Sequence, residues 1–129
     1  MEVNTAIVQV NDIKKYYGKE PTIVKALDGI SFSVEKGSFT AIVGASGSGK
    51  YTLLHLIAGL DVPTSGTVTL AGKNLTDMNT DQATIFRRRN IRIVYHKYNL
   101  MNMLNVYENV IFPIEYWNIY LHLTFHHLQ

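Results

Sequence analysis

The sequence contains no cysteine, which excludes disulfide bonds, thiolate zinc sites and a cysteine nucleophile. It has no apolar run of about 18 residues, so we expect no transmembrane helix. The N-terminal segment lacks the basic flank and apolar stretch of a secretory signal. A net charge of +2 is too small to indicate nucleic acid as a partner. With 129 residues, 47% of them hydrophobic, the chain fits one folded domain and is not expected to be disordered.

Charged side chains are missing from the C-terminal end. All 12 Lys and Arg and all 10 Asp and Glu lie between Glu2 and Glu115, whereas residues 116–129 carry three of the five histidines. The alternation of apolar and polar residues over this segment favours a strand. A metal site at His122, His126 and His127 is one interpretation, and an aggregation-prone apolar tail is the other.

Hydrophobic periodicity predicts a mixture of strands and helices. The segments expected to be strands are 6–10, 30–34, 39–43, 67–70 and 91–95. The short, mostly apolar run 39–43 is predicted to be a central strand that is buried on both faces. The segments expected to be helices are 50–60, 79–89 and 105–114. For the second of these, Asn79 with Gln82 three positions later fits a capping box.

A glycine-rich loop carries the strongest functional signal. It lies between a predicted strand and a predicted helix, as a phosphate-binding P-loop requires. The glycines permit backbone conformations in which N–H groups point inward and form a nest for phosphate oxygens. The start of the helix adds its positive dipole end, and a lysine adds a full charge for the β- and γ-phosphates. The residues expected to bind the cofactor are Gly44, Ala45, Ser46, Gly47, Ser48, Gly49, Lys50, Tyr51 and Thr52.

One position in this loop departs from the P-loop pattern. After Lys50 the pattern requires Ser or Thr, whose short hydroxyl binds Mg²⁺, and here the residue is Tyr51. A phenol oxygen lies at the far end of a ring and overshoots that place. Thr52 is no simple substitute, because one residue along a helix rotates the side chain by about 100°. We therefore expect phosphate binding to be intact and Mg²⁺ binding to be weakened.

The loop and its flanking segments resemble the ATP-binding subunit of an ABC transporter. Besides the loop, the resemblance rests on Val-Pro-Thr-Ser-Gly at 62–66 and Tyr-Glu-Asn-Val at 107–110. Segments 26–32 and 86–91 resemble the branch that exports lipoproteins, macrolides or antimicrobial peptides. The resemblance covers about residues 1–115, as the N-terminal part of a nucleotide-binding domain, and fades over 116–129.

The resemblance implies an α/β fold, in which an antiparallel β subdomain joins a P-loop core. It also implies ATP and Mg²⁺ as cofactors, a homodimer and a transmembrane permease subunit as partner. The expected location is cytoplasmic, peripheral on the inner face of the membrane. In the family an aromatic residue near the N-terminus stacks on adenine; Tyr16 is the best match, with Tyr17 as the second choice.

Catalytic residues of the family are harder to find in this chain. The family glutamine that helps to hold Mg²⁺ and water is replaced by His96, and imidazole is a poor ligand for Mg²⁺. The 129 residues contain neither the segment Leu-Ser-Gly-Gly-Gln nor an apolar strand ending in Asp-Glu. We expect little or no ATP hydrolysis by this chain alone. Two other interpretations stay open: a non-catalytic nucleotide-binding remnant, and a non-functional product of a frameshift near residue 115.

Overall fold

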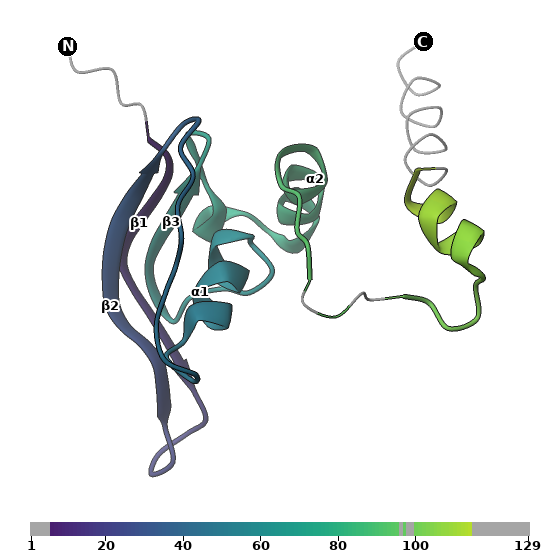
Figure 1. Ribbon diagram of the computed structural model, residues 1–129. Coiled ribbons are helices and arrows are strands. Elements are labelled where there is room, and N and C mark those ends of the chain that lie inside the picture. Colours follow the sequence, from purple (N-terminus) through teal and green to yellow (C-terminus); the bar gives the residue numbers. More distant parts are fainter. Residues whose placement is uncertain (1–5, 96, 98–99, 115–129) are drawn as a thin grey trace, which may run out of the picture. The chain divides into compact units, whose positions relative to one another are not determined.

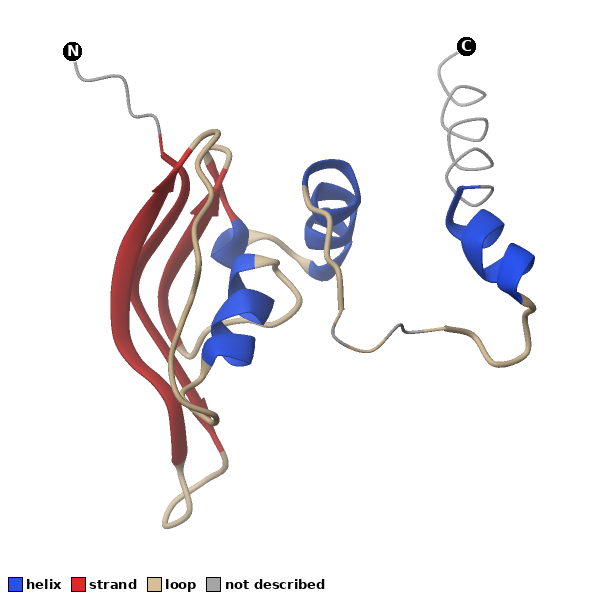
Figure 2. Ribbon diagram, viewed as in Figure 1, coloured by secondary structure: helices blue, strands red, loops and turns tan. Residues whose placement is uncertain are grey.

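The computed structural model describes residues 6–95, 97 and 100–114, which belong to two units that divide after Ile93. In the first unit, four strands form an antiparallel sheet in the order β2-β1-β3-β4 (Figure 1). Two α-helices and a 3₁₀-helix lie on one side of the sheet; α1 lies between β2 and β3 in the chain, and η1 and α2 come after β4 (Figure 2). The elements are β1 Ala6–Tyr17, β2 Val24–Glu35, α1 Lys50–Ile57, β3 Ser65–Leu70, β4 Lys73–Asn74, η1 Leu75–Asp77 and α2 Thr80–Asn90. The expected antiparallel β subdomain is thus confirmed.

The core of the first unit lies between the sheet and α1. Helix α1 buries Leu53 and Leu56 against the sheet, where Val10, Ile13 and Val68 are almost completely shielded from solvent. Because burial of apolar surface is the main stabilising contribution, this contact fixes α1, and with it the glycine-rich loop before it, on the sheet.

Strand β1 is longer than the sequence indicated. The sequence predicted a strand over residues 6–10, but the strand continues to Tyr17 through a β-bulge between Val10 and Ile13. Asp12 takes a φ of +45°, which aspartate tolerates better than most residues, and its N–H donates to Ser31 Oγ at 2.8 Å. The extension carries the strand as far as the two tyrosines.

Two predicted strands are absent from the described residues, and these predictions are wrong. Segments 39–43 and 91–95 are irregular, and Phe39 and Val43 are 97% and 86% exposed rather than buried. An apolar run favours burial, but a strand forms only where a neighbour offers hydrogen-bond partners. Within the described ranges no strand pairs with either segment.

The predicted helices are confirmed, with one earlier end. Helix α1 ends at Ile57 instead of 60, because Gly59 takes a φ of +63°. The N–H groups of Gly59 and Leu60 then return to the carbonyls of Leu56 and His55 in a Schellman motif. Helix α2 has the expected capping box, in which the Asn79 side chain accepts from the Gln82 N–H.

The described part of the second unit contains a helix over residues 106–114, close to the predicted range. Asn105 and Glu108 form a capping box at its start, with N–H to oxygen distances of 2.8 and 2.9 Å. None of the helices in the described ranges has the length and apolar character that crossing a bilayer requires.

Candidate functional site

The glycine-rich loop turns sharply into α1 at Gly49. This residue has a φ of +85°, and a Cβ added there would lie 2.5 Å from the Ala26 carbonyl oxygen on β2. Only glycine combines this conformation with so close an approach. The contact anchors the C-terminal end of the loop on the sheet and sets the start of α1.

The ammonium of Lys50 lies inside the loop that precedes it. Its Nζ donates to the carbonyl oxygens of Gly44 at 2.7 Å and Ala45 at 2.5 Å, and lies 3.3 Å from Ser48 Oγ. The loop thus curls around the end of the lysine side chain. A cation is thereby held at the centre of the loop, next to the first turn of α1.

Two backbone N–H groups of the same loop have no protein acceptor. Among the residues that the structure describes, this holds for the N–H groups of Gly47 and Gly49. No acidic side chain lies in the first turn of α1. Free N–H groups, a helix N-terminus and a lysine together form a site that attracts anions, phosphate above all.

The aromatic ring of Tyr51 lies on the flank of α1. Its centroid is 4.0 Å from that of the His55 ring, with 49° between the planes, and Tyr51 is 62% exposed. The neighbouring Thr52 interacts with Tyr17: burial raises the pKa of the Tyr17 phenol, and the Thr52 hydroxyl partly offsets this rise. The first turn of α1 therefore presents a large ring where the P-loop pattern requires a short hydroxyl.

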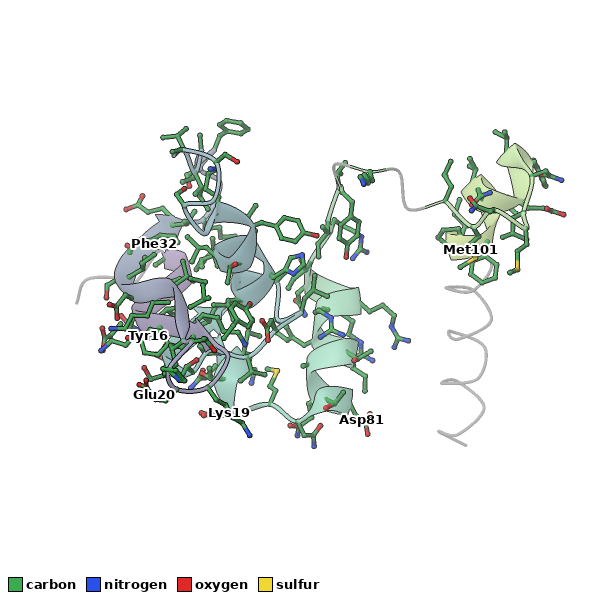
Figure 3. The ribbon with its side chains drawn as sticks, turned by 90° about the horizontal axis from the view of Figure 1, so that it is seen from below. Tyr16, Lys19, Glu20, Phe32, Asp81 and Met101 are labelled. Atoms are coloured by element: carbon green, nitrogen blue, oxygen red, sulfur yellow. The ribbon has the colours of Figure 1, made fainter. Side chains whose placement is uncertain are left out.

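Tyr16 contacts strand β2 and not α1. Its hydroxyl donates to Asp28, and Lys25 Nζ lies 5.2 Å from its ring centroid. The hydrogen bond to Asp28 raises the pKa of the Tyr16 phenol and lowers that of the Asp28 carboxyl. Figure 3 shows Tyr16 on the sheet, close to the β1–β2 turn that carries Lys19 and Glu20.

Tyr17 is the tyrosine that the structure brings to α1. Its hydroxyl donates to Asp61, which follows the helix, at 3.1 Å, and also interacts with Thr52 in the first turn. Burial raises the pKa of the Tyr17 phenol, and the bond to Asp61 adds to the rise. The ring is 43% exposed, and Lys15 Nζ lies 5.0 Å from its centroid.

Lys15 and Asp61 are residues that sequence reasoning missed. Lys15 Nζ donates to Asp61 Oδ1 at 2.8 Å and to the Val62 carbonyl at 2.7 Å. Burial alone would raise the pKa of the Asp61 carboxyl, but hydrogen bonds from Lys15, the Val62 N–H and Tyr17 hold it below its usual value. We call Lys15, Tyr17 and Asp61 the β1–α1 clasp. Nothing local in the sequence signals it, because its members lie far apart along the chain.

The structure describes only some of the residues that the sequence suggested as metal ligands. His96 and the three C-terminal histidines lie outside the described residues. Within the described ranges, no three His, Cys, Asp or Glu side chains gather to hold an ion.

A separate pocket of about 230 Å³ lies between the end of α1 and α2. Its lining is mostly apolar and includes Leu56, Leu75 and Met78, with Arg87 at its edge. The glycine-rich loop does not contribute to it. This pocket is therefore separate from the exposed loop and from the start of α1.

Comparison with known proteins connects this geometry to a family. The family profile described as ABC transporter matches residues 27–128, a range that includes most of segment 116–129. A macrolide export ATP-binding/permease protein, MacB of Hyphomonas neptunium, is 40% identical over 85% of this chain and 17% of its own length. The bacitracin export ATP-binding protein BceA of Halalkalibacterium halodurans is 36% identical over 84% of this chain and 43% of its own.

Solved structures agree with the sequence comparisons. The ATP-binding cassette MJ0796, in a dimeric post-hydrolysis state bound to ADP and Pi, superposes with a TM-score of 0.79. It is 35% identical, and the match covers 84% of this chain and 47% of that one. The chain thus spans less than half the length of these relatives.

Proposed function

This chain belongs to the ABC transporter family, and on this premise we propose that its loop 44–50 binds the phosphates of ATP. One observation carries the proposal. The Lys50 ammonium lies within the loop at the N-terminus of α1, where it donates to two loop carbonyls, and in the described residues the N–H groups of Gly47 and Gly49 in the same loop have no protein acceptor. A site of this kind neutralises and hydrogen-bonds an anion at the same time.

Phosphate would enter by exchange of partners. The Lys50 ammonium turns from the carbonyls of Gly44 and Ala45 to phosphate oxygens, which are stronger acceptors because they are charged. The freed loop then directs N–H groups toward the remaining phosphate oxygens. The helix dipole of α1 favours the negative charge at this end.

For the adenine we propose Tyr17 as the stacking platform. Its ring is partly exposed, and its hydroxyl donates to Asp61, which follows α1, so the ring is held close to the helix that follows the loop. The Tyr16 phenol is bonded to Asp28 on β2 instead. A flat aromatic face that is held in one place can stack on a nucleobase whatever hydrogen-bonding groups the edge of that base carries.

We further propose that the chain serves the ATPase part of an export transporter, on the inner face of the membrane. Two of its relatives carry export in their names, MacB as an ATP-binding/permease protein. A transmembrane permease is therefore the proposed partner. A second copy of the chain is another, since the MJ0796 cassette is dimeric.

The test of ATP binding uses the full chain and calorimetric titration with ATP. We expect a saturable site and a raised melting temperature, since ligand at about 100 times its dissociation constant stabilises by about 2.7 kcal/mol. Lys50→Gln should abolish both effects, and Lys73→Gln, at an exposed lysine on β4, should change neither. Equal binding by the Lys50 variant, or none by the unaltered chain, would overturn the proposal.

A further inference from the structure

The family implies Mg²⁺ beside the phosphates, and the residues of this loop do not fit it. Mg²⁺ requires hard oxygen ligands at about 2.0–2.1 Å in nearly octahedral geometry. The position that should supply such an oxygen is occupied by Tyr51, the second residue of α1. Its ring is held against that of His55, with 4.0 Å between the centroids. A hydroxyl at the far end of this ring does not replace one that is attached directly to Cβ.

The two hydroxyls that flank Lys50, those of Ser48 and Thr52, have other partners. The Thr52 side chain interacts with the Tyr17 phenol. Ser48 Oγ lies 3.3 Å from Lys50 Nζ, where it faces the lysine. No acidic residue occurs in the first turn of α1, and the described residues contain no cluster of metal ligands. Lys50 is therefore the cation that this loop offers to a polyphosphate.

We infer that the loop binds the polyphosphate of a nucleotide without a divalent cation, an inference that rests on the proposed ATP site. Lys50 and the backbone N–H groups neutralise the phosphates, and Tyr51 supplies no short hydroxyl as a ligand for a metal ion. Mg²⁺ in solution binds the same phosphate oxygens of ATP that the loop must bind. The site should therefore bind free ATP more tightly than the complex of ATP with Mg²⁺. Binding of metal and nucleotide are linked, so ATP held by the chain should in turn bind a divalent cation no better than ATP in solution.

The first experiment measures the ATP and tripolyphosphate affinity of the full chain, once in EDTA and once in excess MgCl₂. We expect Mg²⁺ to leave the affinity unchanged or to weaken it. Tyr51→Ser restores the short hydroxyl and should make Mg²⁺ strengthen ATP binding on the order of tenfold, the scale on which metal sites respond to their ligands. Tyr51→Phe keeps a ring against His55 and should behave as the unaltered chain. At 62% exposure, both substitutions should leave the melting temperature nearly unchanged.

A second measurement needs no variant. Titration of Mn²⁺ into ATP with and without the chain, followed by electron paramagnetic resonance of free Mn²⁺, gives the metal affinity directly. We expect the chain to leave that affinity unchanged or to reduce it. Tight ATP binding that requires Mg²⁺, or tighter Mn²⁺ binding in the presence of the chain, would overturn the inference while the proposed ATP site stands. Failure to bind ATP and tripolyphosphate in either buffer would overturn the proposed site, and the inference with it.

Discussion

The hydroxyl of Tyr17 donates to Asp61 Oδ2 across 3.1 Å, which ties the end of β1 to the segment that follows α1. Lys15, two residues earlier, donates to Oδ1 of the same carboxylate at 2.8 Å. The Lys15 side chain is only 13% exposed and that of Asp61 33%. The β1–α1 clasp therefore determines where an aromatic ring lies relative to the helix of the phosphate loop.

Removing the carboxylate charge should destabilise the first unit. Asp61→Asn leaves the poorly exposed Lys15 ammonium without its anionic partner. We expect a loss of about 1 kcal/mol in the free energy of unfolding, the upper end for an exposed ion pair, because Lys15 is largely shielded from solvent while Asp61 keeps some contact with it. Urea denaturation measures it. Asp28→Asn is the matched control, since Asp28 also accepts from a tyrosine and a lysine but is well exposed, and little change is expected. Equal effects of the two substitutions would contradict the structural role of the clasp.

The same carboxylate should make stability depend on pH in the acid range. The pKa of Asp61 is lowered in the folded chain, so its contribution is fully present above the unfolded value of about 3.9. It is lost as the pH falls through the lower, folded pKa. Unfolding free energies between pH 5 and pH 2 should therefore decline less steeply in Asp61→Asn than in the unaltered chain. Parallel curves would show that the carboxyl does not titrate as the structure indicates.

The two tyrosines should separate in their effect on nucleotide binding. Tyr17→Ala should weaken ATP binding about tenfold, because a base stacked on an aromatic ring contributes about 1–3 kcal/mol. It should leave tripolyphosphate binding unchanged, since that ligand has no base. Tyr16→Ala should affect neither ligand. Calorimetric titration of both ligands into both variants decides, and a selective loss of ATP in Tyr16→Ala alone would return the platform to Tyr16.

The sequence could not decide between these tyrosines. They are adjacent, and in a regular strand successive side chains point to opposite faces, so counting from Val10 assigns each tyrosine to one face of the sheet. The pairing of β1 with β2 shifts between Val10 and Ile13 and again between Lys15 and Tyr16. Each shift changes which residues share a face, and none has a clear local signal.

Local signals predicted local structure well. Asn79 with Gln82 fixed the start of α2, and Asn105 with Glu108 lies at the start of the helix 106–114, because a capping box is decided within four residues. Segment 39–43 shows the opposite case. Its apolar run favours a buried strand, but the pairing that makes a strand depends on partners far away in the chain. Within the described residues that partner is absent, so Phe39 stays exposed.

Two loop glycines should respond differently to a methyl group. Gly47 and Gly49 have nearly the same positive φ, +79° and +85°, so alanine at either residue pays about 1–2 kcal/mol for the left-handed conformation. At Gly47 the new Cβ meets nothing within 4 Å, whereas at Gly49 it lies 2.5 Å from the Ala26 carbonyl and 2.9 Å from Leu27. Gly49→Ala must therefore also push the loop away from β2.

We expect Gly47→Ala to lower the free energy of unfolding by the conformational cost alone, and Gly49→Ala to lower it by at least about 1 kcal/mol more, as overpacking does. Chemical denaturation measures the free energy of unfolding of both variants. The conformational cost is common to both, so it cancels in the difference between the two values. Because the displacement at Gly49 also moves the start of α1, that variant should lose ATP affinity as well. Equal stability of the two variants would mean that the loop does not rest on β2, and that Lys50 is positioned by α1 alone.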